Sequence, residues 1–130
     1  MALDDLPEDV LDFLGTYIDS VEELSILLLL CAQPERVWTT SEIVRTLRSA
    51  ENSIATRLEN LYARKILNRL SESGDLHKFT PSTSQVAEVI RHLAEQNQIR
   101  PYRIIEAIYS RPKRAIQQFA NAFRFRKGKE

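Results

Sequence analysis

The chain has 130 residues, of which 43% are hydrophobic and 28% are charged, and this composition excludes disordered and collagen-like proteins. The formal net charge is zero, but residues 1–35 hold nine acids and no Lys or Arg, so residues 36–130 carry a net charge of +9. This asymmetry is typical of a polyanion-binding part beside an acidic arm, and equally of solvated faces on amphipathic helices.

A short amphipathic helix is predicted within the acidic arm, residues 1–19. Pro7 suits the first turn of a helix, and the acids that follow it suit the positive end of the helix dipole. The apolar residues recur at helical spacing: Leu6, Val10, Phe13, Leu14, Tyr17 and Ile18.

A buried helix is predicted next. Ser20-Val-Glu-Glu23 has the pattern of a capping box, and residues 24–32 after it are almost entirely apolar. A helix that is apolar nearly all round belongs in the centre of a domain. The run is half as long as a membrane span, so no transmembrane segment is expected.

A short strand and a short helix are predicted after Pro34. Residues 36–38 are too few for a helix and are assigned to a strand. Thr39-Thr-Ser-Glu42 is a second capping box. It opens a two-turn helix whose apolar face is formed by Ile43, Val44 and Leu47.

A longer helix and a β-hairpin complete the central part of the chain. We expect Ser49 to cap a helix over about residues 50–63, whose apolar face comprises Ile54, Leu58, Leu61 and Tyr62. Residues 66–72 and 76–80 alternate in polarity around a turn at residues 73–75, which predicts two antiparallel strands. Pro81 ends the second strand.

Helical periodicity returns in residues 82–130. Ser82-Thr-Ser-Gln85 is a third capping box, and Pro101 is expected to interrupt or kink the helix that it opens. Residues 100–130 hold nine bases and two acids and contain Phe119, Phe123 and Phe125. This basic end is either a nucleic-acid arm, a flank for acidic lipid, or a helix whose aromatic residues pack inward as core or dimer interface.

These elements predict a mainly α fold with a small β-hairpin, in the α+β class. Their order over residues 21–80 resembles the winged helix-turn-helix domain of bacterial transcription regulators such as the MarR-like group. The stretches that carry the resemblance are residues 37–47 (VWTTSEIVRTL), 49–61 (SAENSIATRLENL) and 66–70 (ILNRL). Lys65 stands at the position before the first wing strand, which is commonly Gly in that family.

The resemblance implies three parts and a set of partners. The parts are an acidic N-terminal helix or arm at residues 1–19, a winged helix-turn-helix domain at 20–81, and a C-terminal helical extension with a basic tail at 82–130. The implied partners are double-stranded DNA and a second copy of the chain, joined through the terminal helices. The acidic arm and the aromatic, basic end are further candidates for a protein partner.

The resemblance also implies that the helix at about residues 50–63 lies in the major groove. Opposite its apolar face lies a stripe formed by Asn52, Thr56, Asn60 and Ala63 and flanked by Ser53 and Glu59, with Arg57 nearer the boundary. Asn bonds adenine and a Thr methyl contacts thymine. The alternative is a plain solvent face, which Glu51 and Glu59 favour because acids repel phosphate. The candidates for phosphate contact are Thr39, Thr40, Ser41, Arg45, Arg48, Arg57, His77 and Lys78.

No catalytic site, cofactor or metal is expected. The sequence has no Gly-rich phosphate loop, and its two histidines lack a metal-ligand spacing. Cys31 lies in the most apolar helix and is expected to be a small buried hydrophobe. The N-terminal carboxylates are expected on a solvent face, beside no base. A single cysteine and an acidic N-terminus without a signal peptide favour a cytoplasmic protein.

Two functions therefore stay open. In the first, the chain is a DNA-binding transcription regulator that reads the major groove. In the second, the winged helix is a protein–protein interaction module that acts on another regulator without sequence-specific DNA binding.

Overall fold

The computed structural model describes residues 6–70 and 75–110, and these residues form a mainly helical α+β fold. Predictions made for the basic tail, including Phe119, Phe123 and Phe125, lie outside the described residues. The elements, in chain order, are α1 (Glu8–Tyr17), α2 (Val21–Ala32), β1 (Trp38–Thr39), α3 (Thr40–Leu47), α4 (Glu51–Ala63), β2 (Leu67–Arg69), β3 (Leu76–Phe79), α5 (Ser84–Ile99) and α6 (Pro101–Tyr109).

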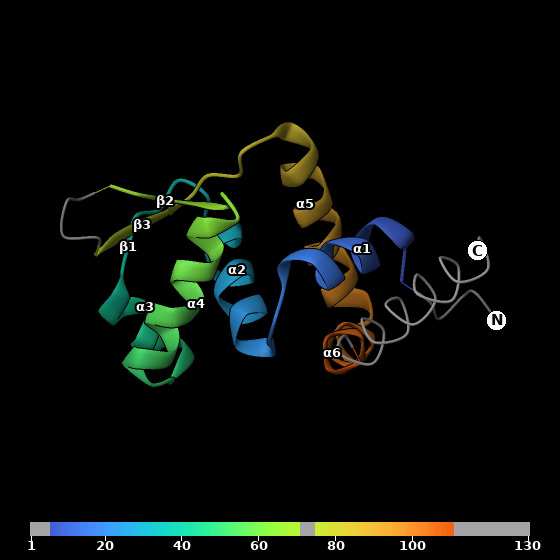
Figure 1. Cartoon of the computed structure of the whole chain (residues 1–130), viewed down its shortest axis with the longest axis horizontal. Coiled ribbons are helices and arrows are strands. Elements are labelled where there is room, and N and C mark those ends of the chain that lie inside the picture. The colour runs from blue at the N-terminus through green and yellow to red at the C-terminus, as the bar shows by residue number, and fades with distance from the viewer. Residues whose placement is uncertain (1–5, 71–74, 111–130) are drawn as a thin grey trace, which may run out of the picture.

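The elements form two groups with α2 between them (Figure 1). The sheet, α3 and α4 lie at one end of the molecule, and α1, α5 and α6 pack on one another at the other end. Helix α2 contacts α3 and α4 on one side and α5 on the other. No helix within the described part of the chain has the length and apolar character needed to cross a membrane.

The central position predicted for residues 24–32 is confirmed. Leu24, Ile26, Leu27 and Leu30 of α2 are buried and belong to one continuous core with residues from every helix. The capping box predicted at its start is only half formed. The Ser20 hydroxyl accepts from the Glu23 backbone N–H, but the Glu23 carboxylate bonds α4 instead of returning to Ser20.

The predicted hairpin is confirmed and belongs to a three-stranded antiparallel sheet of order β1-β3-β2. Trp38 pairs with His77, and Leu67 pairs with Phe79. Strand β1 lies at residues 38–39, because Trp38 is the first residue that can reach β3, so the strand predicted over 36–38 is displaced along the chain. Most of the predicted turn lies outside the described residues.

Helix caps explain where the remaining elements begin. The Thr39 capping box is present in full, and Pro101 begins α6 directly after α5 ends. Two predicted caps are wrong. Ala50, not Ser49, is the residue before α4, and its methyl side chain cannot cap the helix. The Ser49 side chain bonds Glu22 instead. Thr83, one residue after the predicted Ser82, caps α5 by accepting from the Val86 backbone N–H.

Helix α4 ends in a left-handed residue that is not glycine. Lys65 has φ of 62°. Its N–H donates to the Tyr62 carbonyl at 2.9 Å, and the Ile66 N–H donates to the Leu61 carbonyl at 3.0 Å. This is the Schellman arrangement, in which Gly is the usual left-handed residue because it has no Cβ. The position that is commonly Gly in the family resembled by the sequence thus needs a Gly-like backbone here.

Candidate nucleic-acid interface

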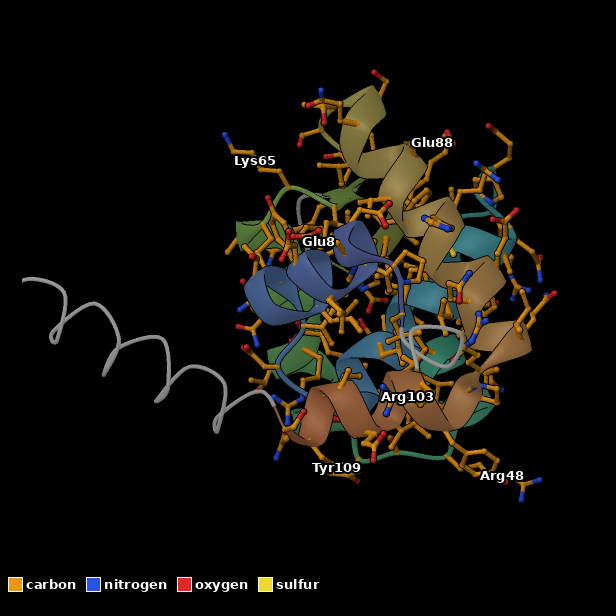
Figure 2. All side chains as sticks on the ribbon, turned by 90° about the vertical axis from the view of Figure 1, so that its right-hand side faces the viewer. Glu8, Arg48, Lys65, Glu88, Arg103 and Tyr109 are labelled. Carbon is orange, nitrogen blue, oxygen red and sulfur yellow. The ribbon has the colours of Figure 1, made fainter. Side chains whose placement is uncertain are left out.

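Helices α3 and α4 pack against each other across a three-residue turn, residues 48–50. Arg48 adopts the left-handed conformation, with φ of 55°, and the Ser49 N–H donates to the Val44 carbonyl at 3.2 Å. This turn reverses the chain and leaves the Arg48 side chain extended into solvent (Figure 2). No hydrogen bond or ion pair from another described residue engages the side chains of Arg45 and Arg48.

The outer face of α4, which we define as Asn52, Thr56 and Glu59, is exposed. The Thr56 hydroxyl donates to the Asn52 carbonyl at 3.0 Å, so the methyl group is its uncommitted part. Together with exposed Ser41 on α3, this face presents small polar groups of the kinds that contact base edges and phosphates.

Glu59 is less free than its exposure suggests. Arg69 of β2 donates to the Glu59 carboxylate, and the same guanidinium lies 4.1 Å from the centre of the Tyr62 ring. The sequence analysis did not identify this cluster, and no local pattern joins the three residues. Two acids of α4, Glu51 and Glu59, weigh against phosphate contact. Arg69 partly neutralises Glu59 and does not pair with Glu51.

A second polar stripe lies beside the outer face, on α4 and its C-cap residue. This stripe, which we call the inner face, comprises Ser53, Arg57, Asn60 and Arg64. Its first two residues contact Glu22 at the start of α2. The Ser53 hydroxyl donates to the Glu22 carboxylate, and the Arg57 Nε lies 3.4 Å from the same oxygen. These partners, the Ser53 hydroxyl foremost, hold the pKa of Glu22 below its usual range.

The other two inner-face residues contact Glu23, whose side chain is fully buried. The Asn60 amide donates to Glu23 Oε2 at 3.1 Å, and Arg64 Nη1 donates to Oε1 at 2.5 Å. Arg64 also donates to Asp19 at 2.9 Å and to the Tyr17 carbonyl. Burial raises the pKa of Glu23, although Asn60 and Arg64 oppose that rise.

Three residues of the inner face were predicted to contact DNA but bond other parts of the protein instead. Ser53, Arg57 and Asn60 were predicted among the DNA-contacting residues, but their side chains bond α2 and are half-buried. The expectation that the N-terminal acids lie beside no base is wrong for Asp19, Glu22 and Glu23. The spacing of the four inner-face residues matches one helical stripe, which is the only signal in the sequence that groups them.

His77 and Thr40 are also engaged inside the protein. His77 is 2% exposed, and its ring nitrogens bond the Tyr62 hydroxyl and, at 2.8 Å, the Thr40 hydroxyl. Burial lowers the pKa of His77 and favours the neutral imidazole. The predicted contact of His77 with phosphate is therefore wrong for this conformation, because the ring ties β3 to α3 and α4.

Thr39 and Lys78 complete the predicted set. The Thr39 hydroxyl and N–H are both used in the capping box with Glu42, and the bond from that N–H is the chief reason why the pKa of Glu42 is low. The half-buried Lys78 ammonium lies 3.5 Å from the Glu35 carboxylate, an exposed partner that a phosphate can replace. The predicted residues with exposed side chains are Ser41, Arg45, Arg48, Asn52 and Thr56.

The described residues contain no cluster of three or more His, Cys, Asp or Glu side chains that could hold a metal ion. The candidate interface therefore rests on exposed helix side chains, chiefly those of Ser41, Arg45, Arg48, Asn52 and Thr56. Comparison of the chain with protein-family models, curated proteins and solved structures gave no significant match.

Proposed function

We propose that the chain is a DNA-binding transcription regulator with a winged helix-turn-helix domain, in which the outer face of α4 reads the major groove. The observation that carries the proposal is the element order α2-β1-α3-α4-β2-β3, with β3 in the middle of the sheet. In that arrangement α3 and α4 form the helix-turn-helix and β2 and β3 form the wing.

The chemistry of the outer face supports the same function. Asn52 and Thr56 lie one helical turn apart and are exposed, so both can reach neighbouring base pairs. Arg45 and Arg48 flank them as unengaged cations suited to the phosphate backbone on either side. Pairing of Glu59 with Arg69 lowers the repulsion that the outer face would exert on DNA.

Selection of random duplex DNA by the purified full-length protein, at low and at near-physiological salt, tests the proposal. The expected result is one enriched motif that survives the higher salt, with weaker binding overall as counterions compete. Two-fold symmetry in the motif would support a homodimer joined through the terminal helices. Binding without a motif, or binding at low salt alone, would contradict sequence-specific regulation.

A second candidate function is a protein-interaction module, and a separate surface favours it. Ile99, at the end of α5, and Tyr102 and Tyr109, on α6, are 64%, 84% and 74% exposed, which is unusual for large apolar side chains. Figure 2 labels Tyr109 on α6. In addition, Arg57 and Arg64 are committed to internal ion pairs. Replacing Tyr102 and Tyr109 by Ser separates the candidates, because a module loses its partner and a DNA reader keeps its motif.

A further inference from the structure

A cavity of about 320 Å³ lies between α2, the end of β3 and α5. Its volume falls in the range of sites that bind small molecules. The apolar part of its wall is formed by Leu28, Ala32, Phe79, Ala87, Ile90 and Ala94. We propose that this cavity binds a small, uncharged and mainly apolar molecule, held by the amides of Asn97 and Gln98.

The alanines explain why the cavity is open. Ala32 at the exposed end of α2 and Ala87 and Ala94, two turns apart on α5, contribute only methyl groups to the wall. Larger apolar residues fill the neighbouring contact, where Leu27, Leu30 and Leu93 are fully buried. The cavity is therefore a local widening of a well-packed interface.

The polar groups of the wall determine the chemistry of the ligand. Asn97 and Gln98 line the cavity, and neither side chain has a hydrogen-bond partner among the described residues. Each amide offers both a donor and an acceptor, which suits a neutral polar group such as a hydroxyl, a carbonyl or an amide.

The charges around the cavity do not favour a simple anion. Arg91 is the one cationic side chain in the wall, and its guanidinium donates to Glu88 and, at 2.9 Å, to Glu95. An anionic ligand would therefore have to compete with two carboxylates of the same helix for the Arg91 charge. Figure 2 shows Glu88 on the outer surface of α5.

Cys31 lies in the wall but does not make the site covalent. Burial raises the pKa of its thiol to about 11, so at neutral pH it stays protonated and is a poor nucleophile. Its Sγ donates to the Leu28 carbonyl at 3.5 Å. As the sole cysteine of the chain, it is instead a reporter whose access to reagent depends on whether the cavity is filled.

Titration of the full chain with two fluorescent probes tests the proposal directly. N-phenylnaphthylamine is uncharged, and anilinonaphthalene sulfonate has the same ring system with an added sulfonate. The expected result is saturable binding of the neutral probe at one site, with the sulfonate binding about tenfold more weakly. Equal or tighter binding of the sulfonate, or no saturable binding of the neutral probe, would overturn the proposal.

A variant with a larger side chain in the cavity tests whether the neutral probe binds there. Ala94→Leu is expected to weaken the neutral probe about tenfold, whereas Ala55→Leu on the exposed side of α4 leaves its affinity unchanged. If Ala94→Leu does not fold, a second measurement on the wild type tests the site. The rate at which Cys31 reacts with a chromogenic disulfide reagent is compared with and without the neutral probe. Saturating neutral probe is expected to slow that reaction, and an unchanged rate overturns the proposal. The test needs no DNA, so its outcome is independent of the proposed regulator function.

Discussion

The two polar faces of α4 lie beside each other on one helix but differ in what they contact. The inner face gives all four of its side chains to the carboxylates of Glu22, Glu23 and Asp19. On the outer face, the Glu59 carboxylate bonds Arg69 of β2, whereas Asn52 stays exposed. A polar stripe on a helix is therefore not yet an interface, because its function depends on whether another element already satisfies it.

This difference also changes the meaning of the charge asymmetry. The acids at the start of α2 neutralise bases of α4, across 35 residues in the Glu22–Arg57 pair and 41 in the Glu23–Arg64 pair. Glu22 and Glu23 thus serve the fold, as does Asp19 at the end of the acidic arm. Within residues 6–70 and 75–110, exposed Arg45 and Arg48 form no ion pair and stay available to a polyanion.

The largest effect is expected from the buried centre of the inner face. Glu23→Ala is expected to lower the free energy of unfolding by about 3 kcal/mol, because Arg64 and Asn60 lose a buried acceptor. Urea denaturation followed by circular dichroism measures it. The matched control is Glu88→Ala, whose exposed carboxylate should matter far less. Similar losses in both variants would contradict a structural role for the inner face.

A smaller effect is expected where α4 meets β3. His77→Phe removes the bonds to Tyr62 and Thr40 and is expected to cost about 2 kcal/mol at pH 8. Because burial lowers the pKa of His77, the unfolded wild type binds a proton below pH 6.5 that the folded protein does not bind. The free energy of unfolding of the wild type therefore falls below pH 6.5. The difference in stability between wild type and the His77→Phe variant becomes smaller. If this difference in stability instead grows as the pH falls, His77 is not buried as a neutral ring.

Glu22 tests the half-buried part of the inner face. Glu22→Gln is expected to cost about 1 kcal/mol at pH 7, since Ser53 and Arg57 lose a charged acceptor. The pKa of Glu22 is lowered in the folded state, so its contribution is present above pH 4.5 and is lost as pH falls through the lowered value. Parallel urea titrations at pH 7 and at acidic pH measure this loss. A pH-independent difference between the two proteins would rule out the ionised pairing.

The smallest change in stability is expected at the end of α4. Lys65→Gly is expected to stabilise the protein by about 0.5 to 1 kcal/mol, because the left-handed residue no longer carries a Cβ. Lys65→Ala keeps the Cβ and is the control, with little change expected. Thermal unfolding of both variants measures the difference, and a gain in the Ala variant equal to that in the Gly variant would argue against the strain.

The elements could be predicted because their signals are local. The Thr39 box, the apolar run of α2 and the alternation of the hairpin each lie within a few residues, and the structure follows them. The partners of the site could not be predicted in this way. Ser53 meets Glu22 across 31 residues and His77 meets Thr40 across 37, and no local pattern in the sequence marks either pairing. From the sequence alone, Asn52 and Asn60 are therefore equivalent candidates for DNA contact. Only the packing of α2 distinguishes exposed Asn52 from Asn60, which bonds Glu23.

The most direct test of the central claim uses the outer face itself. Asn52→Ala combined with Thr56→Ala leaves folding almost unchanged, since both side chains are exposed. Affinity of this double variant for the selected duplex and for a shuffled duplex is compared with wild type and with Ser53→Ala from the inner face. The account predicts that the double variant loses its preference for the selected sequence, by about 1–3 kcal/mol for each base contact, whereas Ser53→Ala keeps it. Wild-type preference in the double variant would contradict the claim that the outer face of α4 reads DNA.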